Sequence, residues 1–217
     1  MTPAPHLSLG LLLTAAAGFA DVVGFIELGG SYISFMSGNT TQMGAALASG
    51  AWSLAIHAGS LVGLFFIGGV VGTWVSLVAG YRWGAAATTA LVTLCFGLTL
   101  VLAYLGLPPA VFMLSLAAGA GAQNAILLSI GSVRLGTTFV TGALFGAAQD
   151  LAKAFRRAAP PWRWAQHLLV WASLMLGALI GGLCYDRFGV NALIIPALLY
   201  LFFLGAFVAR SPAKVLD

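Results

Sequence analysis

One acidic residue lies inside a long apolar run near the start of the chain. Asp21 is flanked by Phe19 and Ala20 on one side and by Val22 and Val23 on the other. If this run crosses a membrane, an ionised Asp costs about 2.5–3.5 kcal/mol at the bilayer centre, so it needs a cavity, a proton or a polar partner. No Lys or Arg lies within such a run. Asp21 therefore either binds a cation or proton, or accepts hydrogen bonds from Ser, Thr or Asn.

The densest polar segment follows about fifteen residues later, between apolar runs. Its candidate residues for a substrate or ion pathway are Ser37, Gly38, Asn39, Thr40, Thr41 and Gln42. Ser and Asn are preferred at helix N-caps, so a short helix is predicted to begin at Ser37 or Asn39 with its amide groups facing a cavity. The alternative is a polar external loop whose side chains form hydrogen bonds between helices.

The two halves of the chain share four short motifs in the same order. The pairs are Gly18-Phe-Ala-Asp21 with Gly121-Ala-Gln-Asn124, Phe35-Met-Ser-Gly38 with Phe139-Val-Thr-Gly142, Ile67-Gly-Gly69 with Ile180-Gly-Gly182, and Arg82-Trp-Gly84 with Arg187-Phe-Gly189. The pairing adds Gln123, Asn124, Thr138 and Thr141 to the candidate pathway residues. We expect these residues to face one cavity together with Asp21 and the segment 37–42.

Composition excludes most classes of protein. Of the 217 residues, 61% are hydrophobic and 6% are charged, with a mean hydropathy of +1.04. Soluble chains carry about 25% charged residues, so a soluble enzyme, a nucleic-acid-binding domain, a disordered protein and a disulfide scaffold are excluded. An all-α bundle of transmembrane helices remains. Six runs are long enough to span a bilayer core of about 30 Å: Leu7–Leu28, Trp52–Val78, Trp83–Leu105, Ala110–Ile130, Trp164–Tyr185 and Val190–Val208.

Two further stretches, Ser31–Ser49 and Ser132–Ala152, are moderately polar and compatible with helix. We predict that they are re-entrant or half-inserted helices; the alternative is that both cross fully and make eight spans. The single membrane domain, residues 1–217, then divides into repeats at about 7–106 and 107–209. Three full spans in each repeat place the second half upside down relative to the first, an inverted-topology repeat that recurs in secondary transporters.

The Lys and Arg residues predict the orientation. With six spans, one side carries eight of them and the other side carries Arg187 alone. Because basic residues accumulate on the cytoplasmic side, both termini are predicted to be cytoplasmic. Asp150 and Lys153 are spaced to pair along one helix face.

The motifs Gly18-x-x-Asp21, Phe35-Met-Ser-Gly-Asn-Thr40, Gly121-Ala-Gln-Asn124 and Thr138-Phe-Val-Thr-Gly142 resemble the YoaK-like family of bacterial inner-membrane proteins. The resemblance covers nearly the whole chain, and the Met-Ser-Gly-Asn-Thr segment is its most specific part. It implies a compact multi-pass protein of the bacterial inner membrane, with about six spans. The resemblance indicates no substrate and no catalytic residues.

The function predicted from these features is a small-solute transporter or permease, coupled to protons or cations through Asp21 if it is coupled at all. A channel is the nearest variant, and a non-transporting accessory protein is the alternative. An intramembrane enzyme fits less well, because Asp21 and Glu27 lie off a common helix face and no nucleophile–base pair is evident. We expect no cofactor and no metal. The expected partners are the lipid bilayer and a small polar solute or ion, with no nucleic acid, and a homo-oligomer is an open possibility.

Overall fold

The computed structural model describes residues 4–127, 140–158, 160 and 162–210. Thr138, and the first part of the predicted stretch Ser132–Ala152, lie outside these residues. Every regular element in the described part is a helix. The elements are α1 (Ala4–Glu27), α2 (Met36–Ala48), α3 (Trp52–Tyr104), α4 (Pro109–Gln123), α5 (Val140–Phe155), α6 (Arg163–Phe188), the 3-10 helix η2 (Gly189–Leu193) and α7 (Ile194–Arg210).

Three helical stretches in the described residues are long and apolar enough to cross a membrane. They are Leu7–Glu27, Trp52–Tyr104 and Arg163–Arg210, the last two with 53 and 48 residues. Helices suit such sequences because a helix satisfies all of its backbone hydrogen bonds within the segment, as a lipid environment requires.

The second stretch, α3, is a helical hairpin. Gly80 has φ 71° and ψ 179°, a conformation that only glycine adopts easily. The chain reverses there, and the Thr88 hydroxyl reaches the Gly72 carbonyl oxygen at 3.4 Å. The two arms cover the predicted runs Trp52–Val78 and Trp83–Leu105. The third stretch reverses in the same way at Gly189, which has φ 57° and is the first residue of η2.

The fourth predicted run is shorter than expected. We predicted a helix over Ala110–Ile130, but α4 ends at Gln123 and the chain continues through turns up to Ile126. At 1.5 Å per residue, its 15 residues span about 22 Å, less than a bilayer core of about 30 Å. The polar pair Gln123 and Asn124 therefore lies where the helix breaks.

The two moderately polar stretches contain short helices. α2 has 13 residues and α5 has 16, which correspond to lengths of about 20 Å and about 24 Å. α2 begins at Met36 after Phe35, which makes no side-chain cap hydrogen bond. The predicted N-cap at Ser37 or Asn39 is therefore wrong: both side chains lie within the first turns of the helix.

Glycines permit two close helix crossings. A Cβ on Gly18 would overlap the Leu174 carbonyl oxygen, and one on Gly177 would overlap the Ala15 carbonyl oxygen, so α1 and α6 pack with their backbones in contact. Small residues at such crossings are the usual means by which membrane helices approach each other.

The α3–α4 crossing is built in the same way. A Cβ on Gly121 would overlap the Phe65 carbonyl oxygen, and one on Gly68 would overlap the Ala118 carbonyl oxygen. The first helix of each half thus packs against a helix of the other half, α1 on α6 and α4 on α3.

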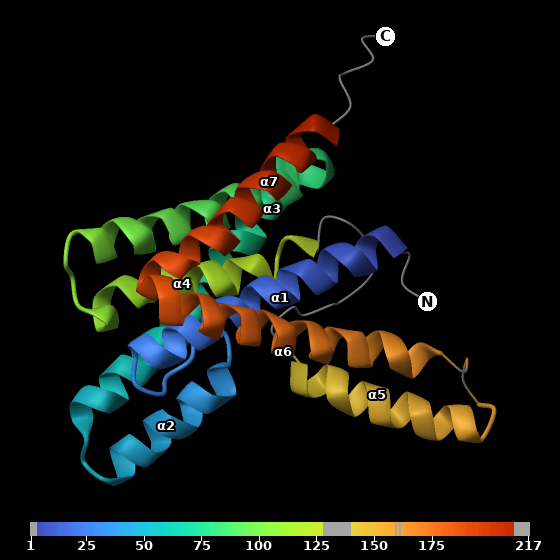
Figure 1. Ribbon diagram of the computed structural model, residues 1–217, viewed down its shortest axis with the longest axis horizontal. Coiled ribbons are helices and arrows are strands. Elements are labelled where there is room, and N and C mark those ends of the chain that lie inside the picture. The colour runs from blue at the N-terminus through green and yellow to red at the C-terminus, as the bar shows by residue number, and fades with distance from the viewer. Residues whose placement is uncertain (1–3, 128–139, 159, 161, 211–217) are drawn as a thin grey trace.

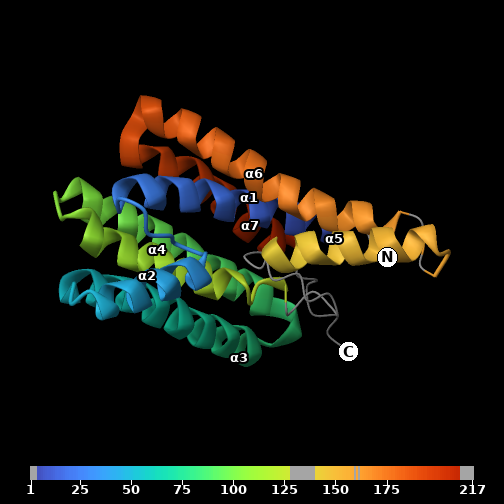
Figure 2. The same cartoon turned by 90° about the horizontal axis from the view of Figure 1, so that it is seen from below.

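The long helices lie side by side (Figures 1 and 2). In Figure 2 the start of α1, the Gly80 turn, the α5–α6 connection and the end of α7 lie toward one end of the molecule. The connections α1–α2, α3–α4 and α6–α7 lie toward the other end. α5 packs along α6, away from α2 and most of α3.

Candidate functional site

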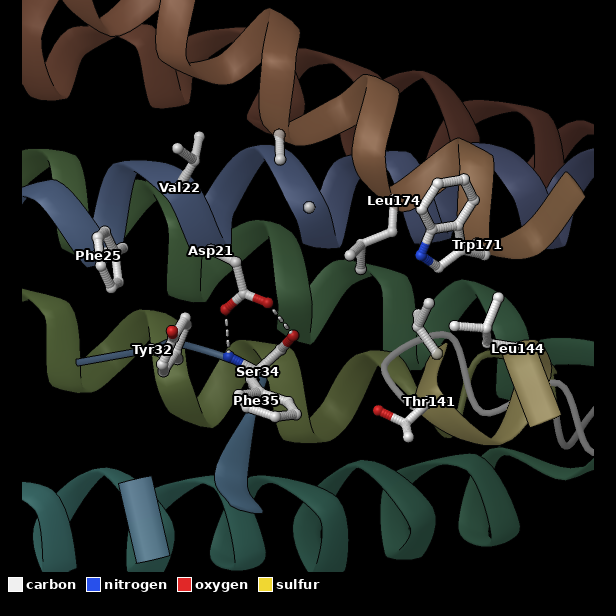
Figure 3. A pocket seen from close by; sticks show the side chains of 13 residues that line it. Asp21, Val22, Phe25, Tyr32, Ser34, Phe35, Thr141, Leu144, Trp171 and Leu174 are labelled. Atoms are coloured by element: carbon white, nitrogen blue, oxygen red, sulfur yellow. Dashed lines mark hydrogen bonds between the residues drawn. The ribbon is translucent and has the colours of Figure 1, made fainter. Parts of the chain in front are cut away.

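Asp21 lies on α1 and binds the loop that joins α1 to α2. Its Oδ1 accepts hydrogen bonds from the backbone amides of Ile33 at 2.9 Å and Ser34 at 2.6 Å, and its Oδ2 accepts one from the Ser34 hydroxyl at 2.5 Å. Figure 3 shows the carboxylate turned toward Ser34. A carboxylate that accepts several amide bonds is well solvated by the protein, which explains how an acid can occupy this position.

Two polar residues of α2, Asn39 and Gln42, hold the same loop. Asn39 is fully buried; its amide donates to the Tyr32 carbonyl oxygen at 2.7 Å, and its oxygen accepts from the Tyr32 amide at 2.9 Å. Gln42 donates to the Gly30 carbonyl oxygen at 2.6 Å and accepts from the Ser31 hydroxyl at 3.0 Å. Buried backbone groups need partners, so these side chains satisfy an irregular segment that lacks its own helix or sheet bonds.

A cavity of about 470 Å³ lies beside Asp21, between α1, the loop, α5 and α6 (Figure 3). Its polar groups come from Asp21, Ser34 and Thr141, and its aromatic rings from Phe25, Tyr32, Phe35 and Trp171. The remaining lining is apolar or glycine, for example Leu144 and Leu174. This size and composition are ordinary for a small-molecule site.

The structure brings only part of the predicted site together. Asp21 and Thr141, one from each half, line the cavity, but no other predicted residue in the described part does. Ser37, Thr40 and Thr41 are exposed on α2, and the two threonine hydroxyls donate to carbonyl oxygens of their own helix. Gly38 packs against the Phe35 ring.

Gln123 and Asn124 also lie away from this cavity. Gln123 is 2% exposed, donates to the Leu13 carbonyl oxygen at 2.9 Å and accepts from the Tyr200 hydroxyl at 2.6 Å. Asn124 donates to the Ala120 carbonyl oxygen at 3.1 Å. Gln123 and Ser34 line a separate void of about 10 Å³, and neither Gln123 nor Asn124 lines the cavity beside Asp21, so the described residues do not form the expected common cavity. Whether these residues belong to a pathway stays a prediction.

Sequence reasoning missed the aromatic residues and Ser34. In the sequence, Trp171 is an ordinary residue of an apolar run. Only the fold shows that its ring lies beside the cavity. The sequence could have indicated Ser34 and Tyr32 as site residues, because both lie in the short segment just before Phe35 of the repeated motif.

A second polar cluster joins α5 to the start of α6. Arg163 donates to both oxygens of Asp150, at 2.7 and 2.6 Å, and the His167 Nε2 lies 3.4 Å from Asp150 Oδ2. The Arg163 guanidinium holds the pKa of Asp150 below its ordinary value. Asp150 was predicted to pair with Lys153; its direct partners are instead these two residues of α6, because α5 and α6 pack side by side. Within the described residues no group of His, Cys, Asp and Glu could hold a metal ion.

A family model described as "Protein of unknown function (DUF1275)" matches residues 9–209. The chain belongs to this family. It is 31% identical over 195 residues to a UPF0700 transmembrane protein of Rhizobium meliloti (strain 1021), an alignment that covers 88% of this chain and 83% of the relative. These matches confirm the YoaK-like resemblance, and with the apolar helices they identify a membrane protein.

A second relative is more distant. The chain is 26% identical over 185 residues to the protein named Aquaporin TIP1-1 of Arabidopsis thaliana, covering 85% of this chain and 70% of the relative. No solved structure matches the chain significantly.

Proposed function

We propose that this membrane protein is a small-solute transporter or permease whose pathway passes through the cavity beside Asp21. The observation that carries the proposal is the cavity itself. It has a volume of about 470 Å³, it lies between segments from both halves of the chain, and it contains a carboxylate. Solute sites at the interface of two repeats are typical of secondary transporters.

The glycine contacts support two inverted repeats. Gly18 and Gly121, which are 103 positions apart, each make a close contact with the second membrane run of the other half: Gly18 with α6 and Gly121 with the first arm of α3. Gly68 and Gly177, which are 109 positions apart, make the reciprocal contacts with the first helix of the other half, α4 and α1. The contacts thus pair Gly68 with Gly177. The Ile-Gly-Gly motifs, which are 113 residues apart, pair Gly68 with Gly181 instead.

The proposed topology has six membrane segments and two short helices, α2 and α5, that enter without crossing. Six spans are favoured over eight because they place eight of the nine Lys and Arg residues on one side, whereas eight spans would place only six there. The basic residues of the Gly80 turn, the α5–α6 connection and the end of α7 gather toward one end of the bundle, which we propose is the cytoplasmic end in a bacterial inner membrane.

Two features support the proposed mode of transport. The relative named as an aquaporin supports a facilitated pathway for a small solute. Asp21 supports coupling, because protonation of its carboxylate would remove the negative charge that strengthens its hydrogen bonds from Ile33 and Ser34 of the loop. Proton uptake would then be linked to movement of the cavity wall.

Flux into proteoliposomes tests the proposal. Glycerol and urea entry can be followed by stopped-flow light scattering, and currents from choline, Na⁺ and proton gradients by electrophysiology on a solid-supported membrane. We expect at least one solute to enter faster than into empty liposomes. Thr141→Trp, which places an indole ring at the cavity and narrows it, should strongly reduce that flux, whereas Thr40→Trp, a matched change at an exposed threonine of α2, should not. Equal flux in the two variants would contradict a pathway through this cavity.

A further inference from the structure

The lining of the cavity has one ionisable carboxylate and no basic side chain. Asp21 is the only acid among the described lining residues, and none of them is Lys, Arg or His. Within the described residues Asp21 also makes no salt bridge; its partners are two backbone amides and one hydroxyl. When ionised, the carboxylate is therefore solvated by dipoles but not neutralised by a cation.

The carboxylate has capacity for a further partner. A carboxylate offers about four acceptor positions, and the loop occupies three of them. Oδ1 accepts two of these bonds and Oδ2 accepts one. Oδ2 can thus accept one more donor or lie beside a positive charge while the loop stays in place.

Aromatic rings lie on both sides of Asp21 (Figure 3). Phe25, Tyr32 and Phe35 form a continuous cluster, with ring centroids 5.2 Å apart in each successive pair. Trp171 comes from α6 and lies on the other side. Phe25 and Phe35 are 42% exposed and Trp171 is 37% exposed, so their rings keep surface available to a molecule in the cavity. Aromatic faces attract cations within about 6 Å of the ring centre, most strongly when water is excluded.

The start of α2 does not favour an anion here. Helix N-termini attract anions through free amide groups. At α2, however, the amide of Met36 donates to the Ser34 carbonyl oxygen and those of Gly38 and Asn39 donate to the Phe35 carbonyl oxygen. These amides are therefore already engaged with the loop.

We infer that the cavity binds a hydrophobic organic cation, a substituted ammonium whose charge lies beside Asp21 and whose apolar groups contact Tyr32, Phe35 and Trp171. The inference deepens the proposed function by naming the class of its solute, and it rests on that function for the step from binding to transport. Apolar walls such as Leu144 and Leu174 match alkyl or aryl groups better than they match an inorganic ion, which needs several oxygen ligands.

Calorimetric titration of the purified full chain in detergent tests the inference with three probes. Choline and 3,3-dimethylbutan-1-ol have nearly the same shape and differ in charge, and benzyltrimethylammonium adds an aromatic ring. We expect benzyltrimethylammonium to bind more tightly than choline, and choline more tightly than the alcohol. Protein-free micelles correct for partition into detergent. If the alcohol binds as tightly as choline, or if no cation binds, the inference is wrong.

Variants locate the binding site. Asp21→Asn should weaken benzyltrimethylammonium binding by about tenfold to hundredfold, and Trp171→Leu by about threefold to tenfold. The matched controls are Glu27→Gln on the same helix and Trp162→Leu at the start of α6, since neither residue lines the cavity. Should Asp21→Asn fail to fold, Trp171→Leu and the order of the three probes on the unmodified protein still decide the matter. Losses equal to those of the controls would overturn the assignment.

The two proposals can fail separately. If glycerol or urea flux is blocked by Thr141→Trp while no cation binds, the transport proposal stands and the organic-cation inference falls. If cations bind in the predicted order but no solute in the flux panel moves, the cavity is a binding site and the transport proposal falls.

Discussion

The backbone amide and the hydroxyl of Ser34 both donate to the carboxylate of Asp21, at 2.6 and 2.5 Å. Asp21 lies on α1 and Ser34 on the loop before α2, so this contact fixes an irregular segment to a long helix. The loop in turn forms one wall of the cavity. The acid therefore has a structural role in addition to the one we propose for it in solute binding.

Asp21→Ala should destabilise the protein. It removes the acceptor from the amides of Ile33 and Ser34, and leaving a buried polar group unpaired costs about 1–3 kcal/mol. Asp21→Asn keeps one acceptor oxygen and should therefore lose less free energy of unfolding. Unfolding by SDS in mixed micelles, followed by circular dichroism, measures both free energies. An Asp21→Ala variant as stable as the unmodified protein would show that the contact with Ser34 does not hold the loop.

Gly68→Ala and Gly177→Ala should each destabilise the fold by about 1–3 kcal/mol, because the added methyl group meets the backbone of the facing helix. Gly63→Ala on the same helix as Gly68 is the control, since a Cβ there would contact nothing. The same detergent unfolding assay applies. If Gly63→Ala is as destabilising as the other two, the effect comes from helix backbone changes and not from the crossings.

The ion pair between Asp150 and Arg163 should make the stability of the α5–α6 pair depend on pH. Because Arg163 lowers the folded-state pKa of Asp150, the carboxylate stabilises the fold above the unfolded-state pKa. That contribution is lost as the pH falls through the folded-state pKa. Since the Arg163 side chain is 42% exposed, we expect a modest effect.

Melting temperatures of the unmodified protein and Asp150→Asn, compared from about pH 7 down to about pH 3, check this expectation. The unmodified protein should melt higher at neutral pH, and the difference should shrink in acid. Lys153→Gln serves as the control, since Asp150 bonds directly to Arg163 and not to Lys153. A difference that does not change with pH would contradict the ion-pair interpretation.

Cysteine labelling tests the proposed topology. In a background with Cys95 and Cys184 replaced by Ala, a membrane-impermeant maleimide added to intact cells should label Pro108→Cys, in the α3–α4 connection. It should not label Arg82→Cys, beside the Gly80 turn, until the cells are opened. External labelling at position 82 would contradict six spans and favour eight.

Much of the fold could be predicted from the sequence, because long apolar runs determine where helices form. The reversals at Gly80 and Gly189 fall between predicted runs, as expected. The end of α4 at Gln123 was missed, since apolar residues continue to Ile130 and hide the break. Asp21 could be predicted as a site residue because an acid within an apolar run needs a polar partner, a proton or a cavity.

The composition of the site could be predicted only in part. Asn39 and Gln42 are polar for a different reason than the one predicted: a buried loop needs hydrogen-bond partners just as a cavity does. Gln123 bonds to the Leu13 carbonyl oxygen, 110 residues away, and such a partner depends on tertiary packing. Trp171 is chemically typical of an apolar helix, so its place at the cavity had no signal in the sequence.

The most direct measurement of the central claim is the reaction rate of Thr141→Cys in the background without Cys95 and Cys184. A trimethylammonium methanethiosulfonate and a sulfonate methanethiosulfonate probe the same position with opposite charges. A cavity that holds a carboxylate concentrates cations, so the ratio of cationic to anionic rates should exceed that at Thr40→Cys on α2. Adding Asp21→Asn should remove the excess, and benzyltrimethylammonium should slow the reaction. Equal ratios at the two positions, unchanged by Asp21→Asn, would contradict an accessible cation-binding cavity beside Asp21.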